Sequence, residues 1–426
     1  MFKYLKKLWR DRRGNALVIA GASLPLIIGS AGLASDTIQW ALMKRQVQRA
    51  ADSAALAGVY GKLAGQTVSV GACTSSNPTS RDLTNGTVST RLGATPTCTI
   101  QTPDSPWNGA SYNAVKVQVS TTRALSFSGL FMSSPPTITA TATAAVVQSG
   151  KYCAKALDPN IETGIDFSGN ATVNLGCGMI ANAKGPNAVD GNGSSSITAS
   201  PVAAVGQIAN SSNFTSGTVF QPYSSPTSDP YASVNAPTVP NNCNQAAIRG
   251  NANSVTANNG TVCYTQLKLT SGQTASFTDE TIILNGGDLD IGAGASLTCL
   301  RCTFVLTTDA TTITSNSIGK VTFNGGASIS LTAPTTGTYS GLVIYKDRRA
   351  PDCTNCNKIN GNSTSYIEGG IYIPTQEIQF SGDSGMNTNC VQLVGWQLTF
   401  TGNTNITNVC PGGPRGWDGS MVRLVA

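Results

Sequence analysis

The 426-residue chain contains no histidine, few charged side chains and few aromatic ones. Without histidine, Ser-His-Asp and Cys-His catalysis are excluded, and so is the commonest metal ligand. Charged residues make up 11% of the chain and aromatic residues 6%. With abundant Gly, Ser, Thr and Asn, this composition is typical of exported β proteins rather than of cytosolic enzymes. Chemistry by carboxylate, Lys or Tyr side chains stays open, but we expect a protein that is not an enzyme and needs no cofactor.

The net charge of +6 is concentrated at the N-terminus. Residues 1–13 carry six basic side chains against Asp11, a balance of +5, so the other 413 residues sum to about +1. A basic cluster beside an apolar run indicates membrane topology rather than nucleic-acid binding. We therefore expect lipid, and no nucleic acid, as a partner of this segment.

Residues 14–35 contain no charged side chain. A helix of this length reaches roughly 33 Å, enough for the hydrocarbon core of a bilayer, with a kink expected at Pro25. The basic segment 1–13 would stay in the cytoplasm, which predicts a single-pass anchor in a bacterial inner membrane and a periplasmic body. The alternative is a cleaved signal peptide with a small-x-small site at residues 32–34.

The helix is expected to continue outside the membrane over residues 36–65, which contain no proline. Residues 50–57 are rich in alanine, so this face permits close approach of another element. The sequence leaves open whether that element belongs to the same domain or to another chain.

All twelve cysteines follow the apolar run, and their even number predicts disulfides formed in an oxidising compartment. Neighbours in the sequence are separated by 25, 24, 20, 3, 3 and 20 residues. Sequential pairing predicts the disulfides Cys73–Cys98, Cys153–Cys177, Cys243–Cys263, Cys299–Cys302, Cys353–Cys356 and Cys390–Cys410. A four-thiolate zinc site or a redox motif at the two Cys-x-x-Cys sequences is the alternative.

The remainder of the chain is predicted to be mainly β. In residues 66–150, Val115, Val117 and Val119 alternate with polar residues, the pattern of a half-buried strand. A long helix followed by such strands is typical of a pilin-like α+β segment, which is a likeness of architecture alone.

Residues 151–426 repeat a short motif, an apolar residue, a small polar residue, Gly, and then Asn, Asp or Gly. Copies begin at Phe167, Leu284, Phe323, Ile359, Phe380 and Phe400. The last five begin 39, 36, 21 and 20 residues apart, close to two, two, one and one units of about 20. Such a period predicts a right-handed parallel β-helix-like domain, with a β-sandwich as the alternative. Prolines around 201–245 predict an irregular excursion.

Two charged places are the candidates for catalysis. Asp288 and Asp290 are two apart on an expected strand and so share a face, and Asp347, Arg348 and Arg349 form the densest charged spot. Loop salt bridges or solvation explain both places without catalysis. The sequence therefore predicts no catalytic and no metal-binding residues.

One spacing pattern marks the first 60 residues. A Gly-Asn pair precedes the apolar run, a proline interrupts it, Gly and Asp close it, and Gln and an Ala-Ala-Asp run follow. The residues are Gly14, Asn15, Pro25, Gly32, Asp36, Gln48, Ala51, Asp52 and Ala55. With this pattern the N-terminus resembles TadE/TadG-like proteins of the Tad (Flp) pilus-assembly system. Residues 342–345, 359–362 and 369–374 carry a weaker likeness to TadG-like proteins.

The resemblance implies an inner-membrane anchor with a periplasmic body that works with other Tad pilus or secretion subunits. Our leading hypothesis is a structural component of Tad pilus biogenesis. A membrane-anchored adhesin or cell-envelope binding protein is the second hypothesis, and a carbohydrate-active β-helix enzyme is the third.

Overall fold

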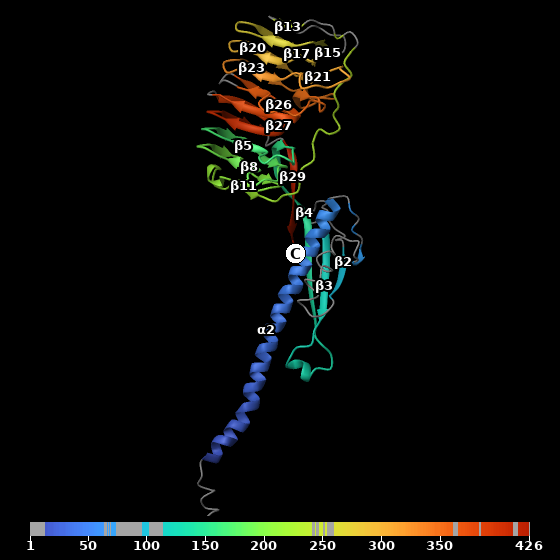
Figure 1. Ribbon diagram of the computed structural model, residues 1–426, viewed down its shortest axis with the longest axis vertical. Helices are drawn as coiled ribbons and strands as arrows, with labels where there is room; N and C mark the ends of the chain where they lie inside the picture. The colour runs from blue at the N-terminus through green and yellow to red at the C-terminus, as the bar shows by residue number, and fades with distance from the viewer. Residues whose placement is uncertain are drawn as a thin grey trace, which may run out of the picture. The chain divides into compact units, whose positions relative to one another are not determined.

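Within the described residues, α2 (Arg13–Leu63) is the one α-helix, and nearly all other regular structure is β (Figure 1). The computed structural model describes residues 13–425 except 64–65, 67, 69, 74–95, 102–113, 241–242, 244–246, 250–251, 254–259, 361–364, 383–384 and 412–415. The chain divides into an N-terminal unit, Met1–Val147 with Val422–Ala426, and a C-terminal unit, Gln148–Met421.

In the N-terminal unit, the second half of α2 packs on an antiparallel sheet formed by β1 (Gly71–Ala72), β2 (Thr97–Gln101), β3 (Ala114–Thr122) and β4 (Thr137–Ala156). The buried helix residues recur every three or four positions, as one helix face requires: Met43, Val47, Ala50, Ala51, Ala54, Ala55 and Val59. Small alanine side chains let the helix approach the buried valines of β3 closely. The alanine-rich face therefore contacts the sheet of its own unit.

This one helix covers the predicted membrane segment, 14–35, and its extension as far as Leu63, and Pro25 is an interior residue of it. Residues 64–65 of the predicted extension lie outside the described residues. No helix is long and apolar enough to cross a membrane within the part of the chain whose side chains are described. The side chains of residues 14–18 and 20 lie outside that part. The single-pass anchor therefore stays a prediction.

The C-terminal unit is a large parallel sheet whose strands fall into three stacks (Figure 1). The long strands β26 (Tyr366–Ser381) and β27 (Gly385–Thr401) pass through all three and shift register between them. The first stack also contains β13 (Ile248–Arg249), β16 (Leu267–Leu269), β19 (Leu289–Ile291), β22 (Val321–Phe323), β25 (Asn357–Ile359), β5 (Ile165–Phe167), β8 (Val189–Gly191) and β11 (Ile208–Ala209).

The other two stacks are built in the same parallel way. The second contains β14 (Ala252–Asn253), β17 (Thr274–Thr278), β20 (Ser296–Leu300), β23 (Ser328–Thr332), β28 (Asn405–Val409), β6 (Thr172–Asn174) and β9 (Ser196–Thr198). The third contains β15 (Thr261–Tyr264), β18 (Thr281–Asn285), β21 (Thr303–Thr307), β24 (Leu342–Lys346), the end of β4, β7 (Gly178–Ala181), β10 (Val202–Ala204) and β12 (Phe220–Gln221). The strand β29 (Trp417–Leu424) pairs with β4.

The chain enters these stacks in the middle rather than at one end. From β4 it runs through β5 to β12 in one direction, and residues 222–247 then lead to β13. Strands β13 to β28 follow in sequence order, so β27 and β28 meet β4, β5 and β6. Asn408 Nδ2 thus donates to the carbonyl oxygen of Leu175, 233 residues away, at 2.8 Å.

The predicted repeat is visible as one column of apolar side chains in the first stack. Five motif copies lie in register there, at Phe323, Ile359, Phe380, Phe400 and Phe167. Ring centroids are 5.2 Å apart between Phe380 and Phe400 and 4.9 Å apart between Phe400 and Phe167. A Cβ at Gly169 (φ +72°) would lie 2.9 Å from the carbonyl oxygen of Gly402, so this corner requires glycine.

Two details of the repeat prediction were wrong. Leu284 belongs to β18 in the third stack, where it pairs with Leu306, because a glycine corner produces the same motif in any stack. The 36-residue interval from Phe323 to Ile359 spans one layer instead of two, because the intervening connections are long.

All twelve cysteines lie in six disulfides, which are the six pairs of neighbours in sequence order. Both Cys-x-x-Cys sequences close on themselves, so neither holds a free thiolate for zinc. Each cross-link restricts the unfolded chain and thereby stabilises the folded one.

Residues 222–240, here called the strap, follow the outer face of the third stack toward β13 (Figure 1, yellow-green). The hydroxyl of Tyr345 donates to the Val234 carbonyl at 3.0 Å, and that of Tyr372 donates to Asp229 Oδ2 at 2.7 Å.

The irregular excursion was predicted to begin around residue 201, which is too early. Pro201 directly precedes the regular strand β10, a position that proline tolerates.

The stacked phenylalanine column predicts where the C-terminal unit is most sensitive to truncation. We expect Phe400→Ala to lower the free energy of unfolding by about 3–5 kcal/mol, since the ring is fully buried between two others. Val409→Ala, at an exposed position of β28, should change it by less than about 0.5 kcal/mol. Urea unfolding of the purified protein measures both, and equal effects would contradict the importance of the column.

Candidate functional site

A loop between β3 and β4 is fixed to α2 by Asp36. The carboxylate accepts hydrogen bonds from the backbone amide of Phe127 at 3.0 Å and from the amide and hydroxyl of Ser128. Gln39 Nε2 donates to Ser126 Oγ at 3.2 Å, and the Phe127 ring packs so closely on Gly32 that a Cβ there would clash. We call this arrangement the Asp36 clamp.

The clamp determines the charge state of its carboxylate. Burial on its own would raise the pKa of Asp36, which is only 3% exposed. The hydrogen bonds from Ser128 and from the amides of Phe127 and Ser128 outweigh burial and hold this pKa below its ordinary value. Asp36 is therefore a charged acceptor at neutral pH.

The other motif residues are distributed along α2. Ala51 and Ala55 are fully buried against the sheet. Gln48 Nε2 donates to Asp52 Oδ1 at 2.8 Å and to the carbonyl oxygen of Thr141 in β4 at 3.0 Å, which ties the helix to the sheet edge. Pro25 is exposed within the helix. Gly14 and Asn15 belong to the first turn of α2, and the surroundings of neither residue are described.

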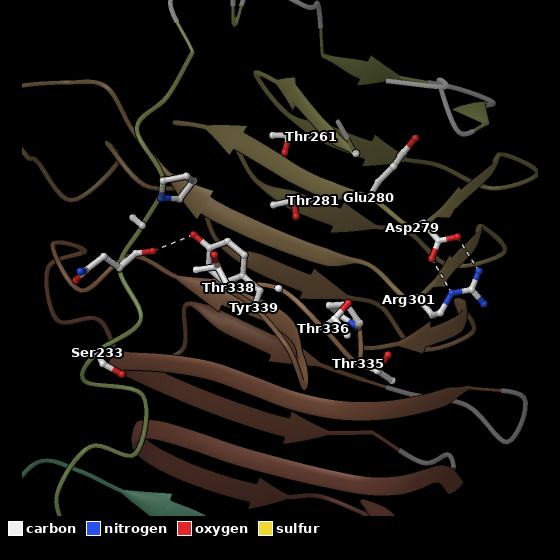
Figure 2. Close-up of a pocket in the computed structure, with 16 residues that line it drawn as sticks. Ser233, Thr261, Asp279, Glu280, Thr281, Arg301, Thr335, Thr336, Thr338 and Tyr339 are labelled. Carbon is white, nitrogen blue, oxygen red and sulfur yellow. Dashed lines mark hydrogen bonds and ion pairs between the residues drawn. The ribbon is translucent and has the colours of Figure 1, made fainter. Parts of the chain in front are cut away.

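The C-terminal unit has a cleft of about 690 Å³ at the corner where the chain passes from the second to the third stack (Figure 2). Its wall combines seven hydroxyl side chains with one ion pair, one buried carboxylate and several proline, alanine and glycine residues. The lining includes Thr261, Asp279, Glu280, Thr281, Arg301, Thr335, Thr336, Thr338 and Tyr339. Tyr339 is fixed by donating its hydroxyl to the Asn235 carbonyl of the strap at 2.9 Å.

The ion pair of the cleft has two-pronged geometry. Arg301 Nε lies 2.6 Å from Asp279 Oδ1, and Nη2 lies 2.7 Å from Oδ2. The hydrogen bond from Arg301 lowers the pKa of Asp279. Both residues have a left-handed φ, +57° for Asp279 and +54° for Arg301, a conformation that non-glycine residues adopt at an energetic cost. The two corners therefore hold polar groups in fixed positions, an arrangement suited to hydrogen bonding of a polar ligand.

The two charged places considered for catalysis have structural partners. Asp290 forms an ion pair with Lys268 at 2.8 Å, and Asp288 accepts from the backbone amide of Lys320 at 2.7 Å. Asp347 Oδ2 accepts hydrogen bonds from Thr307 Oγ1 in β21 and from Arg349 Nη2 in its own loop, each at 2.7 Å. Arg348 binds Asp229 and carbonyl groups of the strap.

A pair of acids that the sequence did not single out lies on the first stack. Asp166 and Asp190 are register neighbours in β5 and β8. Burial raises the pKa of Asp166 to about 6, with further contributions from Asp190 and Glu377. Asp190 accepts from Asn210 Nδ2 at 2.6 Å. Within the part of the chain that the structure describes, no group of three or more His, Cys, Asp or Glu residues is placed to hold a metal ion.

The fold and the clamp define a mainly β protein whose long N-terminal helix is attached to a sheet and a loop at the motif positions. Residues 14–64 match the family model described as putative Flp pilus-assembly TadE/G-like, which confirms the resemblance seen in the N-terminal sequence. No curated protein and no solved structure matches the chain.

Sequence reasoning identified Asp36 and Gly32 but not their partners. The loop residues Ser126, Phe127 and Ser128 follow β3 without any motif of their own. The sequence feature that could have marked this loop is the uncharged stretch 124–150, which directly follows Arg123. The cleft has no such mark in the sequence, because its lining comes from four separate corners of the chain and from the strap.

The clamp predicts a pH dependence of loop docking. Since the folded pKa of Asp36 is lowered, docking is complete above the ordinary carboxyl pKa and is lost as pH falls through the folded value. We expect Asp36→Asn to speed hydrogen exchange at the amides of Phe127 and Ser128 roughly tenfold at neutral pH. Asp52→Asn is the control and should leave both amides unchanged; equal exchange in Asp36→Asn would argue against the clamp.

The acid pair predicts a pH dependence of opposite sign in the C-terminal unit. Because the folded pKa of Asp166 is raised, its contribution to stability is present at low pH and lost as pH rises through about 6. We expect Asp166→Asn to stabilise the protein at pH 8 by about 1–2 kcal/mol, allowing for partial exposure. Urea titrations at two pH values test this, with the exposed Asp309→Asn as control; destabilisation by Asp166→Asn at pH 8 would refute it.

Proposed function

We propose that the chain is a structural component of Tad/Flp pilus assembly or secretion, anchored in the bacterial inner membrane with its body in the periplasm, and not an enzyme. The observation that carries the proposal is the family match over residues 14–64. The Asp36 clamp and the Gln48 contact give the matched motif residues concrete roles in attaching the helix to its unit.

Membrane anchoring is supported by the exposed apolar side chains of α2. Leu24, Leu26, Ile27, Ile28 and Leu33 are between 55% and 76% exposed. Such a run is costly in water, and it follows the basic segment 1–13, which favours a cytoplasmic N-terminus. Six disulfides in the remainder of the chain support an oxidising compartment such as the periplasm.

We further infer that the three parallel stacks of the C-terminal unit form a right-handed parallel β-helix. The in-register motif column and the passage of β26 and β27 through all three stacks support this fold. A parallel stack of this kind is stiff and presents long polar faces, which suits a part that holds partner subunits of the pilus or secretion machinery at a distance.

The leading proposal is tested in the native host. Deleting the gene should strongly reduce surface pili, and the wild-type gene supplied in trans should restore them. The double variant Asp279→Ala, Arg301→Ala should restore piliation as well, since the cleft has no part in the leading proposal. Normal piliation of the deletion strain, counted by electron microscopy, would count decisively against a role in assembly.

A second candidate, a cell-envelope binder or adhesin, is favoured by the cleft. The cleft is lined by hydroxyl side chains, the Asp279–Arg301 ion pair and Tyr339. Groups of these kinds bind sugars, through hydrogen bonds to the sugar hydroxyls and through contact between an aromatic ring and the sugar ring.

This candidate predicts binding of envelope polysaccharide by the purified protein. Asp279→Ala with Arg301→Ala should weaken it by roughly tenfold or more, since charge-assisted hydrogen bonds are lost. The matched control removes an ion pair of the first stack, Lys268→Ala with Asp290→Ala, and should leave binding unchanged. Equal affinity of both double variants for the host's envelope glycans, measured by calorimetry, would dismiss the cleft as the site.

A further inference from the structure

The loop held by the Asp36 clamp, residues 123–136, exposes an apolar tip around the short helix η3 (Ser128–Leu130). Leu130 and Phe131 are each 77% exposed, and Met132 is 48% exposed. Residues 124–136 contain no charged side chain. Three consecutive exposed apolar residues in an uncharged loop are uncommon on a surface that faces only water.

The contacts of the loop show where this tip lies along α2. Ser126 contacts Gln39, Ser128 contacts Asp36, and Phe127 packs on Gly32. Residues 126–128 are thus held against α2 between Gly32 and Gln39. Phe131 is held to Phe127 by an edge-to-face contact with ring centroids 5.4 Å apart. The tip therefore lies beside Gly32, about 5 Å inside the end of segment 14–35.

The same stretch of α2 carries the exposed apolar residues between Leu24 and Leu33. Exposed apolar side chains of the helix and of the loop therefore occur along the same part of α2. Trp40, 46% exposed, lies one helical turn beyond Asp36, and Arg123 is the first residue of the loop. Tryptophan and arginine at this distance from an apolar segment are typical of the membrane interface.

We propose that the η3 loop is a second membrane contact, which places Leu130, Phe131 and Met132 among the acyl chains of the periplasmic leaflet beside α2. This inference rests on the membrane anchoring in the proposed function. The occupant is lipid rather than protein because the three exposed side chains, Leu130, Phe131 and Met132, carry no charged or hydrogen-bonding group to select a partner, and because the loop is held beside the segment proposed to span the bilayer. Two contact points, joined by the clamp, would fix the depth and rotation of α2.

The test uses the full chain in vesicles of phosphatidylethanolamine and phosphatidylglycerol. All native cysteines are disulfide-bonded, so a single introduced thiol can carry a spin label. The label is placed at Phe131→Cys, at Met132→Cys as a second site, and at Tyr223→Cys as an exposed control in the C-terminal unit. We expect the ratio of oxygen to nickel-chelate collisions to be higher at 131 and 132 than at 223, because oxygen dissolves in lipid and the chelate does not.

Flotation separates this inference from the anchoring that it rests on. The triple variant Leu130→Ser, Phe131→Ser, Met132→Ser should still float with the vesicles, since α2 remains inserted. The labelled protein could float and yet show the same collision ratio at positions 131 and 132 as at the exposed position 223. That result would overturn the loop contact and leave the membrane anchor in place. Failure of the wild-type chain to float would overturn both. Low collision rates with both oxygen and the nickel chelate, together with a spectrum broadened by the label of a second copy of the chain, would place the loop against that copy. This result would overturn the lipid contact.

Discussion

The structure of the N-terminal unit depends on how one continuous helix is partnered along its length. From Met43 onward, α2 is covered by the sheet through alanine and valine contacts. Before Asp36, its large apolar side chains have exposed surfaces. Asp36 lies between these regions and supplies a charged acceptor for three donors of one loop. A buried carboxylate is stable only with such donors, so the loop and this residue of the helix require each other.

The C-terminal unit is governed by a different constraint, the pairing of every backbone group in a parallel stack. A stack has two open ends and a chain that must enter and leave it. Here the chain enters in the middle, so that β27 and β28 close against β4, β5 and β6. The strap makes this possible by carrying the chain along the third stack, where Tyr345, Tyr372 and Arg348 bind it.

Local patterns were sufficient to predict much of this molecule. Periodicity and composition indicated the long helix, the valine alternation of β3 and the motif column from Phe323 to Phe400. The number of layers between two motif copies was predicted wrongly where the connections between strands differ in length, as between Phe323 and Ile359, because a fixed period assumes connections of equal length. The meeting of Phe400 with Phe167 could not be predicted either, since nothing in a repeat shows that the chain enters its stack in the middle. Among site residues, Asp36 and Gly32 were found through family resemblance, whereas the cleft depends on corners brought together only by folding.

The proposed function divides the chain at Asp36. The helical segment directly before it spans the lipid, and the body after it lies in the periplasm, with only the tip of the η3 loop in contact with the membrane. The most direct measurement is protease protection in spheroplasts of a chain with one tag at its N-terminus and a second tag between the exposed Thr311 and Thr312. The account predicts that external protease removes the second tag and leaves the first intact. Protection of the tag at Thr311 in intact spheroplasts, with digestion only after lysis, would contradict it.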